Sequence, residues 1–192
     1  MKIVCMTSLA ATTMVSCQKP GDTKHHDDDL YDSVPSSKIP AALNRGPWFS
    51  GTLSAISYFD RDGHKLGNDY EAGREFQFFE TSDGKGRIRF WQYLGMRTYS
   101  TCVTEIFTQK EGSVVFEGDT FTFYPVKGSF KTIKDKCPSG NGTTTRIAAA
   151  DELRPDTWRW ELKSINGKPH LYTYAADDVN HEQVLFVYEC AE

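Results

Sequence analysis

The sequence predicts an all-β protein, built as an antiparallel up-and-down β-barrel of about eight to ten strands with little helix. Three observations support this class. Aromatic residues make up 13% of the chain, and large aromatic side chains suit pleated strands. Short aromatic and β-branched runs alternate with turns rich in Gly, Asp and Asn. The connections are mostly so short that they can join only neighbouring antiparallel strands.

The predicted strands follow one another along the chain and leave no room for a helix that could cover a sheet. Asn166 and Gly167 mark a tight hairpin turn, and residues 134–155 are expected to form a long polar excursion with one helical turn at most. An open sheet of this size would expose a face and two edges, so closure is expected. The runs expected to be strands are 48–59, 74–80, 87–94, 101–109, 113–117, 120–124, 129–133, 157–163, 170–174 and 184–190.

The first 16 residues have the pattern of an export signal, because Lys2 is followed by an uncharged stretch of apolar and small residues. The tetrad MVSC at residues 14–17 resembles a bacterial lipobox, in which the cysteine is lipidated and cleavage falls just before it. We therefore predict a lipoprotein signal peptide over residues 1–16 and lipidation of Cys17. The alternative is a secretory signal that is cut elsewhere and leaves Cys17 as a thiol.

Residues 17–44 are predicted to be a flexible tether that precedes a folded domain at 45–192. The stretch 18–40 is polar and holds three of the eight prolines, so it lacks the apolar surface that would offset the entropy of ordering. The run HHDDD at 25–29 fits a solvated acidic tether better than a metal site, because a disordered run has no fixed ligand geometry. A lipid anchor would place the protein in the cell envelope, on the periplasmic or surface face of the outer membrane.

The composition and the motifs exclude several classes of function. The formal net charge of −4, without a basic stripe, argues against nucleic acid as a partner. No apolar run reaches the ~18–20 residues that a spanning helix needs, so contact with the membrane is expected through the anchor. The sequence contains no His-x-x-x-His, Cys-x-x-Cys or Gly-x-Ser-x-Gly pattern. We expect a monomer that is not an enzyme and holds no cofactor or metal.

The predicted domain contains three cysteines, and an oxidising compartment favours one disulfide among them. We expect Cys102 to pair with Cys137. Cys102 opens one meander strand, and Cys137 follows the end of the third strand after it. Antiparallel order brings these two points to the same end of the barrel, and residues 134–136 can span the remaining gap. Cys190, at the end of the last strand, is the rival partner for Cys137.

A family resemblance rests on Gly46-Pro47-Trp48 at the head of the first strand, which is similar to the Gly-x-Trp of lipocalins. With the lipobox, the polar tether and an aromatic meander containing TFTFYP, the chain looks like the lipocalin-like lipoproteins of bacterial envelopes. The resemblance implies that Trp48 plugs the closed end of a barrel whose mouth binds small, usually apolar molecules. Arg146 and Arg159 are candidates for the arginine that caps this tryptophan in the family. The alternative is that Trp48 is simply a core residue.

Two functions remain as hypotheses. The leading one is a membrane-anchored envelope lipoprotein that binds a small apolar or amphipathic molecule inside a hollow barrel. The alternative is a structural or interaction module with a filled barrel, whose partner is an envelope protein or a glycan. A continuous apolar cavity of about 300 Å³ would favour the first, and a filled interior the second. The residues expected to line a cavity are Phe78, Trp91, Phe107, Phe123, Trp158 and Trp160.

Overall fold

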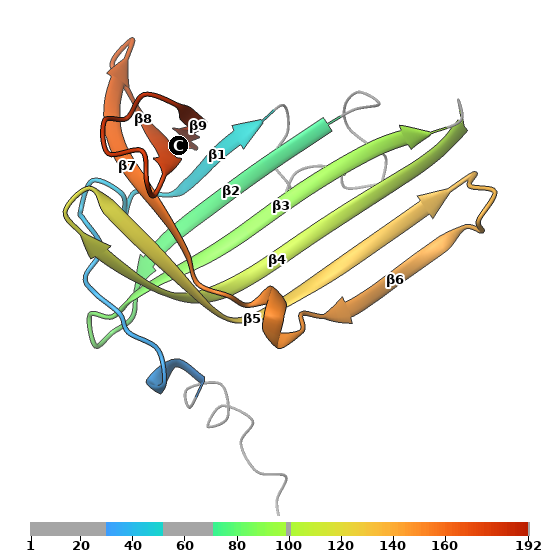
Figure 1. Ribbon diagram of the computed structural model, residues 1–192, viewed down its shortest axis with the longest axis horizontal. Coiled ribbons are helices and arrows are strands. Elements are labelled where there is room, and N and C mark those ends of the chain that lie inside the picture. The colour runs from blue at the N-terminus through green and yellow to red at the C-terminus, as the bar shows by residue number, and fades with distance from the viewer. Residues whose placement is uncertain (1–29, 52–70, 99–100, 192) are drawn as a thin grey trace, which may run out of the picture.

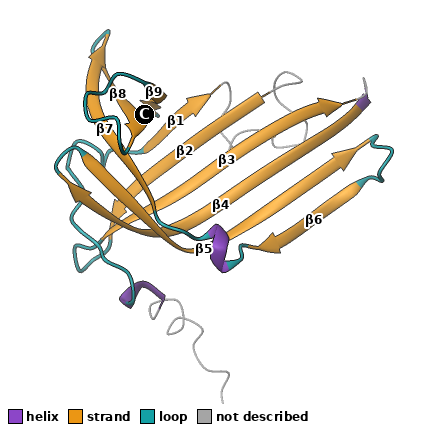
Figure 2. Ribbon diagram, viewed as in Figure 1, coloured by secondary structure: helices purple, strands orange, loops and turns teal. Residues whose placement is uncertain are grey.

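The computed structural model describes residues 30–51, 71–98 and 101–191, and most of this part of the chain is β-strand (Figure 1 and Figure 2). Among these residues, no helix is both long enough and apolar enough to span a membrane. A short 3-10 helix, η2 (Ala150–Glu152), precedes β7. The strands are β1 (Pro47–Gly51), β2 (Glu71–Glu80), β3 (Gly86–Thr98), β4 (Cys102–Glu117), β5 (Thr120–Asp135), β6 (Gly142–Ile147), β7 (Asp156–Ile165), β8 (Lys168–Ala175) and β9 (Val184–Cys190).

Eight of these strands close into a ring in which each neighbouring pair is antiparallel. The order around the ring is β1-β2-β3-β4-β5-β7-β8-β9, and β9 returns to pair with β1. β7 pairs with the first half of β5, whereas β6 pairs with its second half and lies outside the ring. Chain neighbours are thus mostly spatial neighbours, which confirms the predicted all-β, up-and-down barrel.

The ring is closed at one end and flared at the other (Figure 1). The closing pairs are short, because β1 meets β9 at Trp48 and Phe49, and β5 meets β7 from Thr120 to Phe123. By contrast, β4 and β5 are 16 residues long each, and together with β3 and β6 they continue past the ring as an extended sheet. The barrel therefore has a closed half and an open half.

The predicted breaks between strands at residues 110–112 and 125–128 are wrong, because both stretches lie inside the long strands β4 and β5. The register of this pair shifts between Glu111 and Gly112, where β5 carries the extra residue Val126. Such a β-bulge bends a strand without ending it. Glycine fits at position 112 because a Cβ there would lie 2.0 Å from the backbone oxygen of Tyr124.

The bulge also changes which side chains of β5 face the barrel interior. Before the bulge, Phe123 points into the core. After it, Phe130 lies opposite Thr108 and faces inward, while its neighbour Lys131 lies opposite Phe107 and faces outward. Because of the extra residue, the first half of β5 forms part of the barrel wall and its second half forms part of the extended sheet.

Strand β6 lies within the region predicted to be a polar excursion. All six of its residues, Gly142 to Ile147, are exposed. A strand that buries neither face shows no alternation of apolar and polar residues, so the sequence carried no signal for it. The short exposed strand is held by its hydrogen-bonded pairing with β5.

Residues 35–46 pack across the closed end of the barrel, although the sequence analysis assigned most of them to the tether. The backbone N–H of Ser37 donates to the carbonyl of Val114, and the carbonyl of Ser37 accepts from the N–H of Gly86, each over 2.9 Å. Leu43 is completely buried. The predicted boundary at residue 45 is therefore too late, because a few well-placed apolar side chains suffice to dock this otherwise polar segment.

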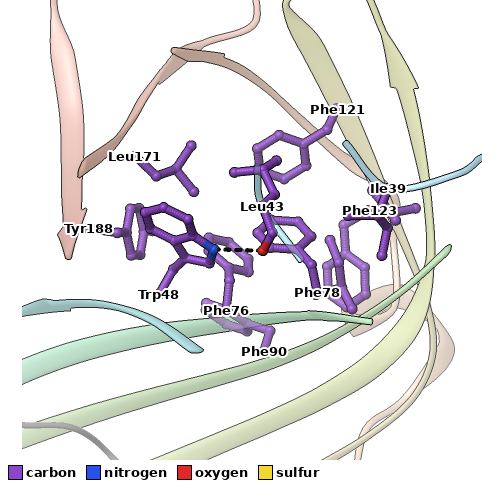
Figure 3. Close-up of a cluster of buried hydrophobic side chains, with 12 residues drawn as sticks. Ile39, Leu43, Trp48, Phe76, Phe78, Phe90, Phe121, Phe123, Leu171 and Tyr188 are labelled. Carbon is purple, nitrogen blue, oxygen red and sulfur yellow. Dashed lines mark hydrogen bonds between the residues drawn. The ribbon is translucent and has the colours of Figure 1, made fainter. Parts of the chain in front are cut away.

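An aromatic core fills the closed half of the barrel (Figure 3). The segment before β1 contributes two of its side chains, and the strands contribute the rest from their inward faces. Burying each large apolar side chain stabilises the fold by about 1.5–3 kcal/mol. The buried members are Ile39, Leu43, Trp48, Phe76, Phe78, Ile88, Phe90, Val114, Phe121, Phe123, Leu171 and Tyr188.

The predicted disulfide between Cys102 and Cys137 is confirmed, with 4.3 Å between the two Cα atoms. The layout that suggested it was different, because β4 and β5 are adjacent and only one inter-strand step separates the two cysteines. Cys102 opens β4 and Cys137 follows the end of β5, so antiparallel pairing brings them together directly. Cys190 lies on β9 opposite Trp48 and packs against the core.

Candidate functional site

The six aromatic residues predicted to line one cavity lie on two opposite faces of the barrel wall. Four of them face the interior, namely Phe78, Phe123, Trp158 and Trp160. The ring of Phe76 packs against two of them, Phe78 and Trp158, and against three further rings, with 5.1 to 5.9 Å between centroids. Among the described residues, packed aromatic side chains thus fill the closed half of the barrel, where an enclosed ligand was expected.

Trp91 and Phe107 face outward, so the prediction of a single lining is wrong. Trp91 follows the core residue Phe90 on β3, and successive side chains of a strand point to opposite faces. Phe107 lies opposite Tyr93 on the same outer face. Both residues line an open pocket with a volume of about 310 Å³ on the outside of the extended sheet.

Hydrogen-bonding side chains from three strands accompany these two aromatic residues. The pocket side chains form two rows across β3 to β6, and within each row cross-strand partners face one another: Trp91, Gln109 and Ser129 in one row, and Phe107, Lys131 and Thr145 in the other. The rows join aromatic faces to an amide, two hydroxyls and an ammonium group.

A second pocket, of about 290 Å³, continues from the first one. The two pockets share Gln109 and Ser129. The second adds Glu111, Lys127 and Ile147, and Ile147 is 82% exposed. We call the two pockets together the outer groove.

The charges of the outer groove are unevenly compensated. The carboxylate of Glu111 accepts from Arg89 Nε at 3.2 Å and from the Tyr31 hydroxyl at 2.8 Å. By contrast, Lys131 makes no ion pair with any residue that the structure describes, and its Nζ lies 5.9 Å from the centroid of Phe107. The groove therefore presents an uncompensated cation beside an aromatic ring.

Trp48 lies in the core near the closed end of the barrel, and its indole N–H donates to the carbonyl of Leu43 (Figure 3). The two arginines proposed to cap it have other partners. Arg146 binds Glu152 through two nitrogens, at 2.6 and 2.7 Å. Arg159 binds Asp119 with its Nη1 at 2.7 Å. Neither arginine serves as the cap.

A polar cluster lies where the β4–β5 turn meets the loop before β9. His181 stacks on Tyr174 with 4.4 Å between ring centroids, and its Nε2 lies 3.2 Å from Asp119. Arg159 lowers the pKa of Asp119, chiefly by its hydrogen bond. Over the described residues, no three His, Cys, Asp or Glu side chains gather as metal ligands would. We interpret this cluster as structural: it holds the loop before β9 against the β4–β5 turn.

Several predicted features lie outside the described residues. These are the signal peptide, Cys17, the HHDDD run and residues 52–59 of the first predicted strand. The comparison with family models, with curated proteins and with solved structures finds no match for this chain. The resemblance to lipocalin-like lipoproteins therefore stays a prediction from motifs.

The polar residues of the outer groove were not predicted. Gln109, Ser129, Lys131 and Thr145 lie on three strands, and only the register of these strands brings them together. The alternation of side chains along a strand could have indicated that Trp91 and its neighbour Phe90 point to opposite faces of β3. Nothing local indicates the bulge that turns Lys131 outward.

Proposed function

We propose that this protein is a lipid-anchored recognition module of the cell envelope that binds an acidic glycan through the outer groove and catalyses no reaction. The observation that carries the proposal is the division of the aromatic residues. Four of the six residues predicted to line a cavity belong to a packed core, whereas Trp91 and Phe107 line an open outer pocket next to amide, hydroxyl and ammonium groups.

Sugar rings have apolar C–H faces and a periphery of hydroxyls, so they are bound by aromatic faces flanked by hydrogen-bonding side chains. Trp91 and Phe107 can supply the stacking surface. Gln109 and Ser129 can each donate and accept hydrogen bonds. Lys131 would form a charge-assisted hydrogen bond with a carboxylate, sulfate or phosphate of the glycan. The open outer surface accommodates an extended polymer better than an enclosed molecule.

The filled core favours this function over the leading hypothesis of a ligand held inside the barrel. Phe76 and the five rings around it leave the closed half packed. The barrel would then serve as a rigid frame for its outer face. An anchor at Cys17 would hold this frame near the membrane, because the 12 residues from 18 to 29 span at most ~40 Å.

The proposal can be tested by binding to an array of acidic and neutral glycans, followed by calorimetric titration of the best acidic oligosaccharide. We expect Trp91→Ala and Phe107→Ala to weaken binding at least tenfold. Lys131→Gln should remove the preference for acidic over neutral sugars.

A matched control is Tyr172→Ala, because the part-exposed Tyr172 on β8 also lies beside a lysine, with 4.7 Å from its ring centroid to Lys163 Nζ. This variant should bind like the wild type. The proposal is wrong if no glycan on the array binds, or if Trp91→Ala binds as tightly as Tyr172→Ala.

A further inference from the structure

Two cations face the barrel interior just beyond the aromatic core. Arg74 precedes the core residue Phe76 by two positions on β2, so both side chains point to the same face. Lys110 on β4 lies directly opposite Phe90, another core residue. Arg74 and Lys110 thus form a cationic layer between the packed core and the open half of the barrel.

Aromatic rings pack against the guanidinium of Arg74. Its Cζ lies 4.1 Å from the ring centroid of Phe186 and 5.6 Å from that of Phe90. The hydroxyl of Tyr188 is near this group: burial raises the pKa of Tyr188 to about 12, and Arg74 lowers it in smaller part. Because this hydroxyl is neutral at physiological pH, it is no counter-ion for Arg74.

The charge of Arg74 is incompletely satisfied in the structure. Its Nε is buried without a hydrogen-bond partner, and its guanidinium forms no ion pair with a described residue. A buried polar atom without a partner is unfavourable, and more so when the group is charged. An oxyanion brought by a ligand would supply the missing acceptor in the geometry that a guanidinium binds best.

The surroundings of the cationic layer are also positive overall. Lys110 Nζ donates to the backbone carbonyl of Glu152 over 2.6 Å. The carboxylate of Glu152, whose pKa Lys110 also lowers in smaller part, is bound by Arg146 and makes no ion pair with Lys110. Asp156, which lies opposite the core residue Phe123, is an acid near both cations: burial raises its pKa, and Arg74 and Lys110 lower it in smaller part. Asp156 makes no ion pair with either cation, and the residue is exposed. Neither Arg74 nor Lys110 therefore has a carboxylate bound to it.

Apolar side chains follow on the same inner face toward the open half. Gln92 lies opposite Arg74, and Leu94 is the next inward-facing residue of β3. Ile106 lies directly opposite Leu94, which is 36% exposed. Along β3, the step of two residues from Gln92 to Leu94 is ~6–7 Å. A molecule whose anionic end reaches Arg74 would therefore place its other end against this apolar surface.

We propose that the cationic layer binds the oxyanion head of an amphipathic molecule, a carboxylate or phosphate, whose apolar chain lies against Leu94 and Ile106. This site is separate from the outer groove, because it occupies the opposite face of the same sheet. It needs no cavity within the packed core, since the ligand lies beyond the core.

The test is calorimetric titration of the full chain carrying Cys17→Ser, which removes the proposed anchor, with four probes below their micellar concentrations. Dodecanoate and dodecyl phosphate carry both head and chain, dodecanol lacks the charge, and acetate lacks the chain. We expect at least one of the two anionic amphiphiles to bind at least tenfold more tightly than dodecanol and acetate. The comparison between the two anions identifies the preferred head group.

Arg74→Gln should weaken the binding of the preferred anion at least tenfold. The control is Arg89→Gln, because Arg89 lies on the outer face of β3, where it pairs with Glu111 and its Cζ lies 4.7 Å from the ring centroid of Phe79. Trp91→Ala should leave this affinity unchanged, so a failure of the glycan proposal can be told apart from a failure of this one.

The proposal is overturned if dodecanol binds as tightly as the anions, if no probe binds, or if Arg74→Gln binds like Arg89→Gln. If Arg74→Gln does not fold, Lys110→Gln and Leu94→Ser take its place. Lys110→Gln should reduce the dependence of anion binding on salt, and Leu94→Ser should reduce the difference between dodecanoate and acetate. Wild-type behaviour of both variants would equally contradict the site.

Discussion

The indole N–H of Trp48 donates a hydrogen bond to the backbone carbonyl of Leu43 over 2.9 Å, and both side chains are completely buried (Figure 3). The bond ties the segment before β1 to the first strand of the barrel. It satisfies a polar atom that burial would otherwise leave without a partner. Residues 35–46 are therefore part of the folded domain, and they determine how one end of the barrel is closed.

Leu43→Ala should lower the free energy of unfolding by about 2–5 kcal/mol, because it opens a cavity in a packed core. Leu30→Ala is the matched control, since Leu30 also precedes β1 in the chain and is 39% exposed. Its effect should stay within about 0.5 kcal/mol. Urea unfolding followed by tryptophan fluorescence measures both, and equal effects would show that the segment does not pack as described.

Replacing both Cys102 and Cys137 with alanine should lower the free energy of unfolding by about 3–4 kcal/mol. The reason is that the bond closes a loop over a sequence separation of 35, which restricts the unfolded chain. Urea unfolding with and without a reducing agent measures the effect. The reductant should destabilise the wild type and leave the variant unchanged.

Peptide mapping of the oxidised protein under non-reducing conditions provides the second check on this bond. It should yield a peptide that links Cys102 to Cys137. A peptide that links Cys137 to Cys190 instead would contradict the structure.

Glu152 should make stability depend on acid pH. Arg146, by its hydrogen bonds, and the backbone N–H of Ala149 lower the pKa of Glu152 to about 2 from its ordinary 4.5. The unfolded chain therefore binds the proton first, so the contribution of Glu152 is present above about pH 4.5 and is lost as the pH falls toward 2. Glu152→Gln should flatten the pH dependence of the urea midpoint between pH 5 and 2.

The control for this prediction is Glu117→Gln, because Glu117 is an exposed glutamate that makes no ion pair with a described residue. This variant should retain the wild-type slope. Equal slopes for Glu152→Gln and the wild type would mean that Arg146 does not hold Glu152 in solution.

Cys17→Ser should release the protein from membranes or stall it as an unprocessed precursor, since the proposed acyl anchor needs the thiol. Fractionation of cells without detergent, with mass spectrometry of the purified protein, measures the change. Cys190→Ser serves as the control and should remain membrane-bound. Unchanged membrane association of Cys17→Ser would refute the anchor.

The sequence alone predicted the fold class and the disulfide, because both follow from where the strands and turns lie along the chain. Aromatic and β-branched runs separated by turns indicate strands wherever they occur, and short connections make these strands neighbours. The pairing of Cys102 with Cys137 was correct although the number of strands between them was not. It depended only on their lying at one end of an antiparallel array.

The tertiary structure decided which face of each strand is inside, and therefore where the two proposed sites lie. One bulge opposite Gly112 places Phe123 in the core and Lys131 on the outer groove, although both occupy odd positions of one strand. A single extra residue reverses the inward side of everything that follows. Arg74 likewise has the sequence context of an ordinary strand residue, and only the closure of the ring of strands places its side chain in the barrel interior. Register and closure arise from pairing between distant segments, which the local pattern of a sequence does not contain.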